Sequence, residues 1–292
     1  MWIVLAFASA FFAGITSILA KIGIKNTDSN LATAIRTLVV LAFAWIIVFA
    51  TDAYEALGSI DSYSLVFLIL SGLATGGSWL CYFKALQIGE VNKVTAIDRF
   101  SVVLTMLLAL IFLGESITGL GALAIVLITV GTYLMVSKSV AKKNHDSKSA
   151  DSKKWIIFAM LAAVFASLQA ILGKVGISNI NSNLGTAIRT VVVVIMAWCI
   201  VFLRGKQRDV KTIDKRSWLF LVLSGVATGA SWLCFYGALH DGPASVVIPI
   251  DKLSILVTVV FSIIILKERF SKKSVLGLAL LVVGTLLLLI SQ

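Results

Sequence analysis

An aspartate and a basic residue stand side by side inside two otherwise apolar segments of the chain. The first segment contains "IDRFS" at 97–101 and the second contains "IDKLS" at 250–254. A charge at the centre of a bilayer costs about 2.5–3.5 kcal/mol on insertion scales, and less near the interface. Such residues are expected either to form a structural pair or to line a polar pathway, and the sequence leaves both interpretations open.

More basic residues gather around each aspartate. Lys21 closes the apolar segment at 3–22 and Arg36 opens the next one, so both should approach Asp98 and Arg99. The second cluster repeats this set with Lys174, Arg189, Asp251 and Lys252. An Arg36–Asp98 bridge is one interpretation, because pairing offsets the cost of a buried charge. The other is a pathway in which three bases and one acid per cluster favour a carboxylate or phosphate ligand.

A second repeated pattern combines small residues with tryptophan, as "SGLATGGSW" at 71–79 and "SGVATGASW" at 224–232. Its glycines are spaced four apart, a pattern that lets two membrane helices approach closely, so helix packing is the expected role. Trp79 and Trp232 follow one turn later. A place in the aromatic belt at the membrane interface is expected for them. The alternative is an aromatic wall for a substrate, with a flat apolar face and an indole N–H.

The elements that position these residues follow from composition. The chain has 292 residues, of which 59% are hydrophobic and 13% are charged, and its mean hydropathy is +1.03. A soluble domain has about 25% charged residues, so this is an all-α integral membrane protein. The net charge of +11 comes mostly from short connectors. Membrane topology explains that charge better than nucleic-acid binding does.

Ten apolar segments are long enough to cross a bilayer, which takes about 20 residues. They are 3–22, 31–50, 63–83, 93–113, 117–136, 155–175, 184–203, 217–238, 245–266 and 274–290. The segments are too long and continuous for strands of a membrane barrel. Their connectors are short except for a polar, lysine-rich and serine-rich linker at 137–154. That composition is typical of a linker between two units.

The two units are copies of each other. "SNLATAIRT" at 29–37 returns as "SNLGTAIRT" at 182–190, and eleven of sixteen positions agree between 71–86 and 224–239. The shift is 153 residues at each landmark. The chain is therefore divided into a first five-helix repeat at 1–136, the linker at 137–154 and a second repeat at 155–292. An odd number of crossings per repeat predicts an inverted pair about an axis in the membrane plane.

Inversion predicts where the clusters and connectors lie. All but three of the 25 Lys and Arg residues fall on the side of the connectors that follow odd-numbered segments. The positive-inside rule places that side, with the linker, in the cytoplasm and both chain ends outside the cell membrane. Asp98 and Arg99 are then expected near the inner face and Asp251 and Lys252 near the outer face, as two opposite gates.

These residues also resemble a known family. The five-helix unit, the arginine early in its second helix, and the "LGE" or "LKE" that closes its fourth helix are similar to the EamA family of the drug/metabolite transporter superfamily. The closing acids are Glu115 and Glu268, which we expect to cap the helix that follows each of them. The likeness covers nearly the whole chain except the linker, and looks like a tandem fusion of compact five-helix members.

The resemblance implies ten helices in two bundles around a central pathway, with alternating access. Members are similar in moving amino acids, nucleotides or other small metabolites. Ten-helix members usually have both ends in the cytoplasm, whereas the lysine and arginine distribution here predicts both ends outside. Small multidrug exporters of the superfamily rely on an acid in their first helix. This chain carries Thr16 and Gln169 at the equivalent positions, which disfavours a purely cationic ligand.

The function expected is therefore secondary transport of a small anionic or zwitterionic metabolite through a multi-pass membrane protein. A channel or a lipid scramblase is the alternative, although polar residues concentrated near two faces fit alternating access better. An enzyme is not expected, because no phosphate-binding loop or Ser/His/Asp arrangement occurs. Cysteine and histidine spacing predicts no metal site and no cofactor. The expected partners are a small-molecule substrate and the lipid bilayer, not nucleic acid, and a homodimer is left open.

Overall fold

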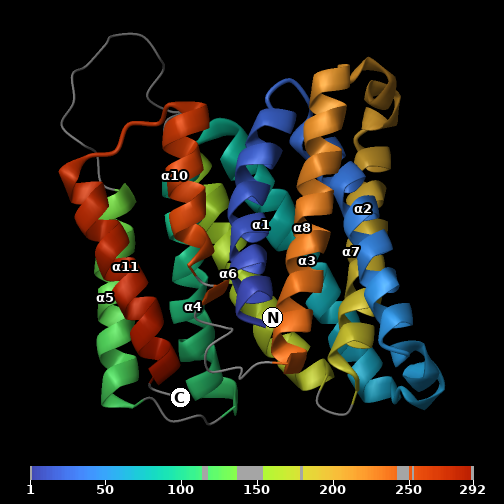
Figure 1. Cartoon of the computed structure of the whole chain (residues 1–292). Helices are drawn as coiled ribbons and strands as arrows, with labels where there is room; N and C mark the ends of the chain where they lie inside the picture. Colours follow the sequence, from blue (N-terminus) through green and yellow to red (C-terminus); the bar gives the residue numbers. More distant parts are fainter. Residues whose placement is uncertain are drawn as a thin grey trace.

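The computed structural model describes residues 2–113, 118–136, 154–177, 180–241, 250–251 and 253–290. Within these ranges all regular secondary structure is helical. Figure 1 shows the helices standing side by side in a single bundle. Large apolar side chains on its outside are exposed, among them Phe7, Ile111, Tyr133 and Leu203, as expected of a surface that faces lipid. The chain is a multi-pass membrane protein.

The helices follow the apolar segments closely. The first copy contains α1 (Trp2–Gly23), α2 (Ser29–Ala50), α3 (Ser62–Ile88), α4 (Val91–Leu113) and α5 (Gly119–Val136). The second copy contains α6 (Lys154–Gly176), α7 (Ser182–Leu203), α8 (Lys215–Asp241), α10 (Ser254–Leu266) and α11 (Lys272–Ile290). Within the described ranges, eight helices, α1 to α8, are long and apolar enough to cross a membrane. The segment at 245–266 appears only as α10, since 242–249 and 252 lie outside the described residues, and the number ten stays a prediction.

Short polar side chains start several of the helices. Asp28 precedes α2 and accepts hydrogen bonds from the backbone N–H groups of Asn30 and Leu31, at 2.9 and 3.2 Å. Asp214 precedes α8 and accepts from both the side chain and the N–H of Ser217. Those bonds hold the pKa of Asp214 below its usual range. Such caps satisfy N–H groups that the helix itself leaves unpaired.

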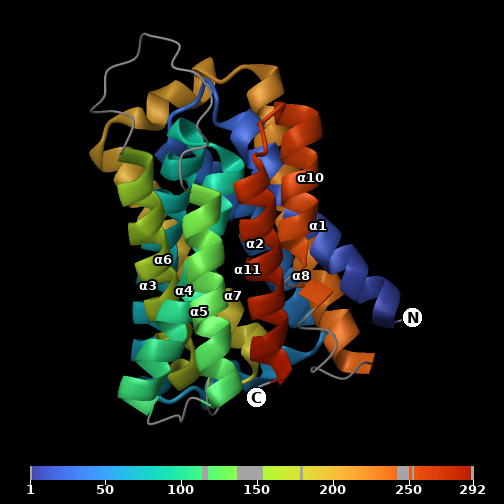
Figure 2. The same ribbon diagram turned by 90° about the vertical axis from the view of Figure 1, so that its left-hand side faces the viewer.

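The two copies interlock instead of folding as separate halves. The principal pairs are α1 with α8, α3 with α6, α2 with α7, and α5 with α11, and each pair joins one copy to the other. Figures 1 and 2 both place α5 beside α11 at one side of the bundle. An operation that superposes each copy on the other maps the α1–α8 pair onto the α6–α3 pair. The same operation maps the α2–α7 pair and the α5–α11 pair onto themselves. The arrangement therefore has a pseudo-two-fold relation.

Repeated hydrogen bonds follow the same relation. Ser71 donates to the carbonyl of Gln169 at 2.8 Å, and its equivalent Ser224 donates to the carbonyl of Thr16 at 3.0 Å. About two turns further along the same helices, Ser78 donates to a carbonyl of α6 at 2.9 Å and Ser231 donates to a carbonyl of α1 at 3.1 Å. Serine hydroxyls thus fasten α3 to α6 and α8 to α1 in the same way.

The glycines of the repeated motif pack as predicted. A Cβ built at Gly72 would lie 2.7 Å from Cβ of Val192, and one built at Gly225 would lie 2.7 Å from Cβ of Val39. These distances are too short for any larger residue without a shift of the neighbouring helix. The close approach of α3 to α7 and of α8 to α2 therefore depends on these glycines.

The chain direction alternates along the bundle. In Figure 1, α1 rises from the lower end and α5 finishes at the upper end, whereas α6 starts at the upper end and α11 finishes at the lower end. The second copy is therefore upside down relative to the first. Both chain ends are marked in the lower half of the view. Of the predicted linker at 137–154, residues 137–153 lie outside the described residues, and Lys154 is the first residue of α6.

Candidate functional site

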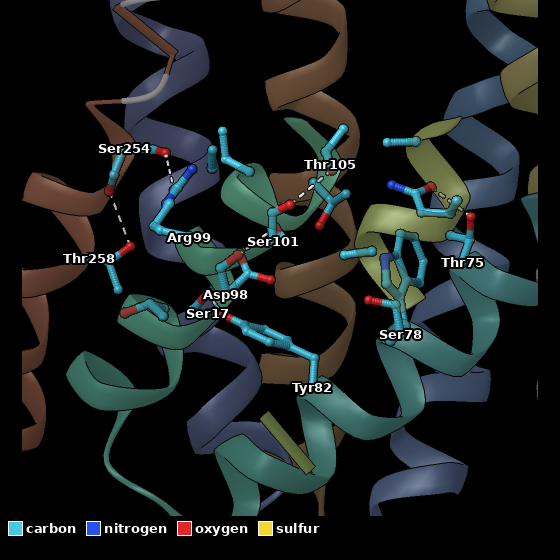
Figure 3. Close-up of a pocket in the computed structure, with 18 of the residues that line it drawn as sticks. Ser17, Thr75, Ser78, Tyr82, Asp98, Arg99, Ser101, Thr105, Ser254 and Thr258 are labelled. Carbon is cyan, nitrogen blue, oxygen red and sulfur yellow. Dashed lines mark hydrogen bonds between the residues drawn. The ribbon is translucent and has the colours of Figure 1, made fainter. Parts of the chain in front are cut away.

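A cavity of about 1130 Å³ lies between the two copies. Its lining comes from both repeats, and Figure 3 shows part of it. The charged residues in the lining are Arg36, Asp98 and Arg99. The polar and aromatic ones include Ser17, Thr75, Ser78, Trp79, Tyr82, Ser101, Thr105, Gln169, Thr228, Trp232, Ser254 and Thr258. A mixture of apolar walls and a few polar groups is typical of a small-molecule site.

The two repeated motifs contact each other at this cavity through Arg99 and Ser254. Arg99 lies about two turns inside α4 and donates from Nη2 to Oγ of Ser254 at 3.0 Å (Figure 3). Ser254 is the last residue of "IDKLS" and the first of α10. The expectation of two gates at opposite faces is therefore corrected. Because α4 enters from the upper end and α10 begins within the bundle, the motifs approach each other in its interior.

Asp251 contacts α1. Its Oδ1 accepts a hydrogen bond from Oγ of Ser9 at 2.8 Å, and Ser9 in turn lies 3.3 Å from the hydroxyl of Ser231 on α8. Asp251 is thus hydrogen-bonded to a serine of α1 that also contacts a serine of α8. Lys252 lies outside the described residues.

Arg36 is buried between α2 and α8. Its exposed fraction is 2%, and it donates from Nε to Ser224 at 2.9 Å and from Nη2 to Thr228 at 3.1 Å. Its Cζ lies 4.0 Å from the centre of the Phe83 ring, which adds a cation–π contact. Nη1 has no hydrogen-bond partner. The proposed bridge to Asp98 is therefore wrong, because the bonds of Arg36 run to hydroxyls of the second repeat.

A smaller cavity of about 330 Å³ continues from the first and contains Arg189. The two cavities share the side chains of Thr75, Trp79, Gln169, Thr228 and Trp232. Arg36 and Arg189, which are equivalent in the two repeats, therefore face one continuous polar region between them.

Trp79 and Trp232 line both cavities and are half-buried. A place in an interfacial belt stays a prediction for both residues. The alternative interpretation, an aromatic wall around a ligand, fits their position. Because α3 and α8 run beyond the predicted segments 63–83 and 217–238, both tryptophans lie nearer the middle of their helices than the sequence predicted.

Two of the predicted lysines do not line the cavity. Lys21 donates from Nζ to the carbonyls of Leu86, Gln87 and Gly89 at the end of α3, with the last bond 2.5 Å long. These carbonyls have no partner within the helix, so Lys21 acts as a cap of α3. Lys174 is exposed in the last turn of α6.

Glu268 also has a different role from the expected one. Its carboxylate accepts hydrogen bonds from the N–H groups of Val91 and Asn92, at 2.6 and 3.1 Å. It therefore caps α4 of the first repeat and not the helix that follows it. Burial raises the pKa of Glu268 above its usual value, although the two N–H groups oppose the shift. Glu115 lies outside the described residues.

Sequence reasoning missed several polar residues of the site. Ser224 and Thr228 hold Arg36, and Tyr82 hydrogen-bonds Ser17 at 2.8 Å within the cavity. Thr75, equivalent to Thr228, lies 2.8 Å from Oε1 of Gln169. The signal was present in the repeated motif "SGxATG", whose serine and threonine are spaced four apart in both copies. Residues four apart share a helix face, so both hydroxyls had to point the same way.

The charges of the region favour an anion. Arg36, Arg99 and Arg189 outnumber Asp98 among the charged residues that line the two cavities. Hydroxyl, amide and indole groups around them can donate further hydrogen bonds. The arrangement can bind a small anion, or a zwitterion whose positive end faces Asp98.

Comparison with known proteins agrees with the duplicated architecture. The sequence model of the EamA-like transporter family matches residues 1–137 and 153–290. An "Uncharacterized transporter in cobO 3'region" from Sinorhizobium sp is 44% identical over 137 residues, which are 47% of this chain and 97% of that protein. An uncharacterized protein of Methanocaldococcus jannaschii is 29% identical with the same coverage. Each of these relatives thus corresponds to about one repeat.

A solved crystal structure has a similar fold. It aligns with 97% of this chain and 94% of its own length, with a TM-score of 0.64 and 15% sequence identity. At that identity the likeness concerns the arrangement of the helices alone.

Proposed function

Because this chain belongs to the EamA-like transporter family, we propose that it is a secondary transporter of a small anionic or zwitterionic metabolite. One observation carries the proposal: a cavity of about 1130 Å³ lies between the inverted repeats and is lined by Arg36, Arg99 and Asp98. Cavities between inverted repeats are where transporters of other folds bind their substrates. Two arginines against one acid select for a carboxylate or phosphate group.

Alternating access is the mechanism that the pseudo-symmetry supports. Each repeat contains the same set of helices, but the side chains around Arg36 and around Arg189 adopt different hydrogen bonds. If the copies exchange these arrangements, the molecule reaches a second state of similar energy that opens toward the opposite face. The cavity shared by the repeats then remains in place while access to it changes.

The first test is uptake by proteoliposomes that contain the purified protein. Labelled benzoate, phenylalanine and adenosine monophosphate serve as probes of the organic-acid, amino-acid and nucleotide classes. We expect saturable uptake of at least one probe, accelerated when the same compound is present inside. A fluorescent-lipid scrambling assay on the same vesicles tests the alternative function. Uptake of none of the probes, non-saturable flux or rapid lipid scrambling contradicts secondary transport.

The orientation in the cell membrane is a second part of the proposal. The distribution of Lys and Arg supports a cytoplasmic linker at 137–154 and external chain ends. Cys81, Cys199 and Cys234 are first replaced, so that these native thiols cannot react. Single cysteines then introduced into the linker should be protected from an impermeant thiol reagent in intact cells. Cysteines at either terminus should react. Labelling of the linker with protected termini would reverse the orientation.

A further inference from the structure

The guanidinium of Arg36 is held in one position and retains one open donor nitrogen. Ser224 and Thr228 accept hydrogen bonds from Nε and Nη2, and Cζ lies 4.0 Å from the centre of the Phe83 ring. Nη1 is buried and has no hydrogen-bond partner, although Arg36 lines the cavity. A buried N–H group without a partner is costly, so a polar atom supplied from elsewhere would stabilise it.

The charge of Arg36 is also uncompensated. Both of its hydrogen-bond acceptors are neutral hydroxyl groups, and no ion pair joins it to an acid of the described chain. A buried cation without a partner is strongly destabilising. Arg99 differs, because Asp98 precedes it directly on α4. Of the two arginines in the larger cavity, Arg36 is therefore the one that lacks a counter-charge next to it.

The geometry points to Nη1 of Arg36 as the anchor for the carboxylate of a planar organic monoanion. This inference rests on the proposed function and names the chemical group and the residue that binds it. One carboxylate oxygen accepts from Nη1, supplying both the missing hydrogen bond and the missing negative charge. A phosphate dianion fits less well, since two of the three guanidinium nitrogens are already engaged and Asp98 would repel a second negative charge.

The rest of the ligand is expected to be flat and apolar. Trp79 and Trp232 supply aromatic surfaces in the same cavity, whose lining also includes the small side chains of Ala13, Ala166 and Ala170. Aromatic faces bind planar groups by offset stacking. Because Nη1 is buried in this conformation, an anion reaches it only when the neighbouring side chains shift. Binding is thereby tied to the change of conformation that transport requires.

The test measures binding by purified protein in detergent, with thermal shift and calorimetry. Benzoate, phenylacetate and 2-naphthoate are compared with their uncharged amides, which have nearly the same shape. We expect each acid to raise the melting temperature more than its amide does. Arg36→Gln should weaken benzoate binding about 10- to 100-fold, the range for loss of a charge-assisted hydrogen bond. Arg216→Gln is the matched control, since Arg216 also lies over an aromatic ring but is exposed outside the cavity.

A second variant pair covers the case in which Arg36→Gln does not fold. Ser224→Ala removes the acceptor of Nε and should weaken benzoate binding about threefold, because the guanidinium loses part of its fixed orientation. Ser71→Ala, at the equivalent position of the other repeat, should weaken it less. The anchor is overturned if acids and amides raise the melting temperature equally, or if no acid raises it. It is also overturned if folded Arg36→Gln binds benzoate with unchanged affinity, or if both serine variants lose the same amount of benzoate affinity.

Different results would contradict the anchor at Arg36 and the proposed transport function. Native-like benzoate uptake by proteoliposomes of Arg36→Gln would overturn the anchor and leave transport standing. Benzoate binding that depends on Arg36, without uptake of any probe, would overturn transport and leave the anchor standing.

Discussion

The surroundings of Arg36 and Arg189 differ although the sequence repeats around both. Arg36 donates to Ser224 and Thr228 of the opposite repeat. Thr75, the equivalent of Thr228, instead lies 2.8 Å from Oε1 of Gln169. Nη1 of Arg189 lies only 2.8 Å from the point that a Cβ of Gly173 would occupy. The side chains of the two arginines therefore contact different neighbours, although the arginines occupy equivalent positions in the two repeats.

Two substitutions on the first helix of each repeat explain the difference. Gln169 stands where the first repeat has Thr16, and Gly173 stands where it has Ala20. The longer side chain of Gln169 reaches the threonine hydroxyl, and the missing methyl of Gly173 leaves room for the guanidinium. Since the residues are four apart, they lie on one face of α6. A pseudo-symmetric backbone can thus carry two chemically different sites.

The largest effect is expected from removing the two arginines in turn. Arg36→Gln should reduce uptake of a transported anion about 10- to 100-fold, because a buried, charge-assisted contact is lost. Arg189→Gln should reduce it by less than about tenfold, because that side chain lines only the smaller cavity. Initial rates in proteoliposomes at equal protein content measure both. A greater loss in Arg189→Gln would reverse the assignment of the principal site.

Exchanging the residues that differ between α1 and α6 should give the Arg189 site the ligand-binding behaviour of the Arg36 site, and the reverse. The double variant Gln169→Thr with Gly173→Ala gives the second repeat the residues of the first. Arg189 should then approach Ser71 and Thr75, and the protein should bind a second benzoate, visible as a change in calorimetric stoichiometry. The reverse exchange, Thr16→Gln with Ala20→Gly, should weaken benzoate binding about tenfold or less. Unchanged binding in both exchanges would show that other residues set the difference.

The hydrogen bond between Ser17 and Tyr82 marks a further asymmetry, because Ala170 and Phe235 occupy the equivalent positions. Tyr82→Phe should lower stability by about 1 kcal/mol, since it leaves the buried Ser17 hydroxyl without its partner. Adding Ser17→Ala should recover most of that loss by recreating the apolar pair of the second repeat. Thermal unfolding in detergent measures both variants. A double variant that is less stable than Tyr82→Phe alone would contradict this account.

The smallest effect concerns Glu268 at the start of α4. Burial raises its pKa above the usual value of 4.5, so the folded chain takes up this proton at a higher pH than the unfolded chain does. Stability from this group is present below the unfolded pKa and is lost as the pH rises through the folded pKa. Between pH 7 and 5, the native protein should gain less than about 1 kcal/mol relative to Glu268→Gln. Melting temperatures of both proteins at the two pH values check the sign, and a relative loss on acidification would refute it.

Much of the architecture followed from the sequence. Apolar runs of about 20 residues marked the helices to within a few residues at most ends, because the lack of water in a bilayer forces the backbone to satisfy its own hydrogen bonds. The duplication and the odd number of segments per copy predicted the inverted arrangement seen in Figure 1. The glycines of the repeated motif were correctly assigned to packing.

Individual partners did not follow from the sequence. Lys21 was expected beside Asp98 and instead caps α3, and Glu268 was expected to cap the next helix and instead caps α4. In each case the true partner belongs to a helix that is distant in sequence or to the other repeat. A pattern along one helix indicates which face is polar, but it does not indicate which neighbour that face meets.

The sequence by itself determined that this is a duplicated, inverted membrane fold with charges inside it, because composition, period and repetition are properties of the chain alone. Only the tertiary structure decided that Arg99 meets Ser254 and that Arg36 meets Ser224 and Thr228. Those contacts depend on α4 packing against α10 and α2 against α8, each pair joining one copy to the other. The physical reason is that a buried charge is stabilised by whichever hydroxyls the packing of helices brings within about 3 Å, and packing is settled by the shapes of both copies together.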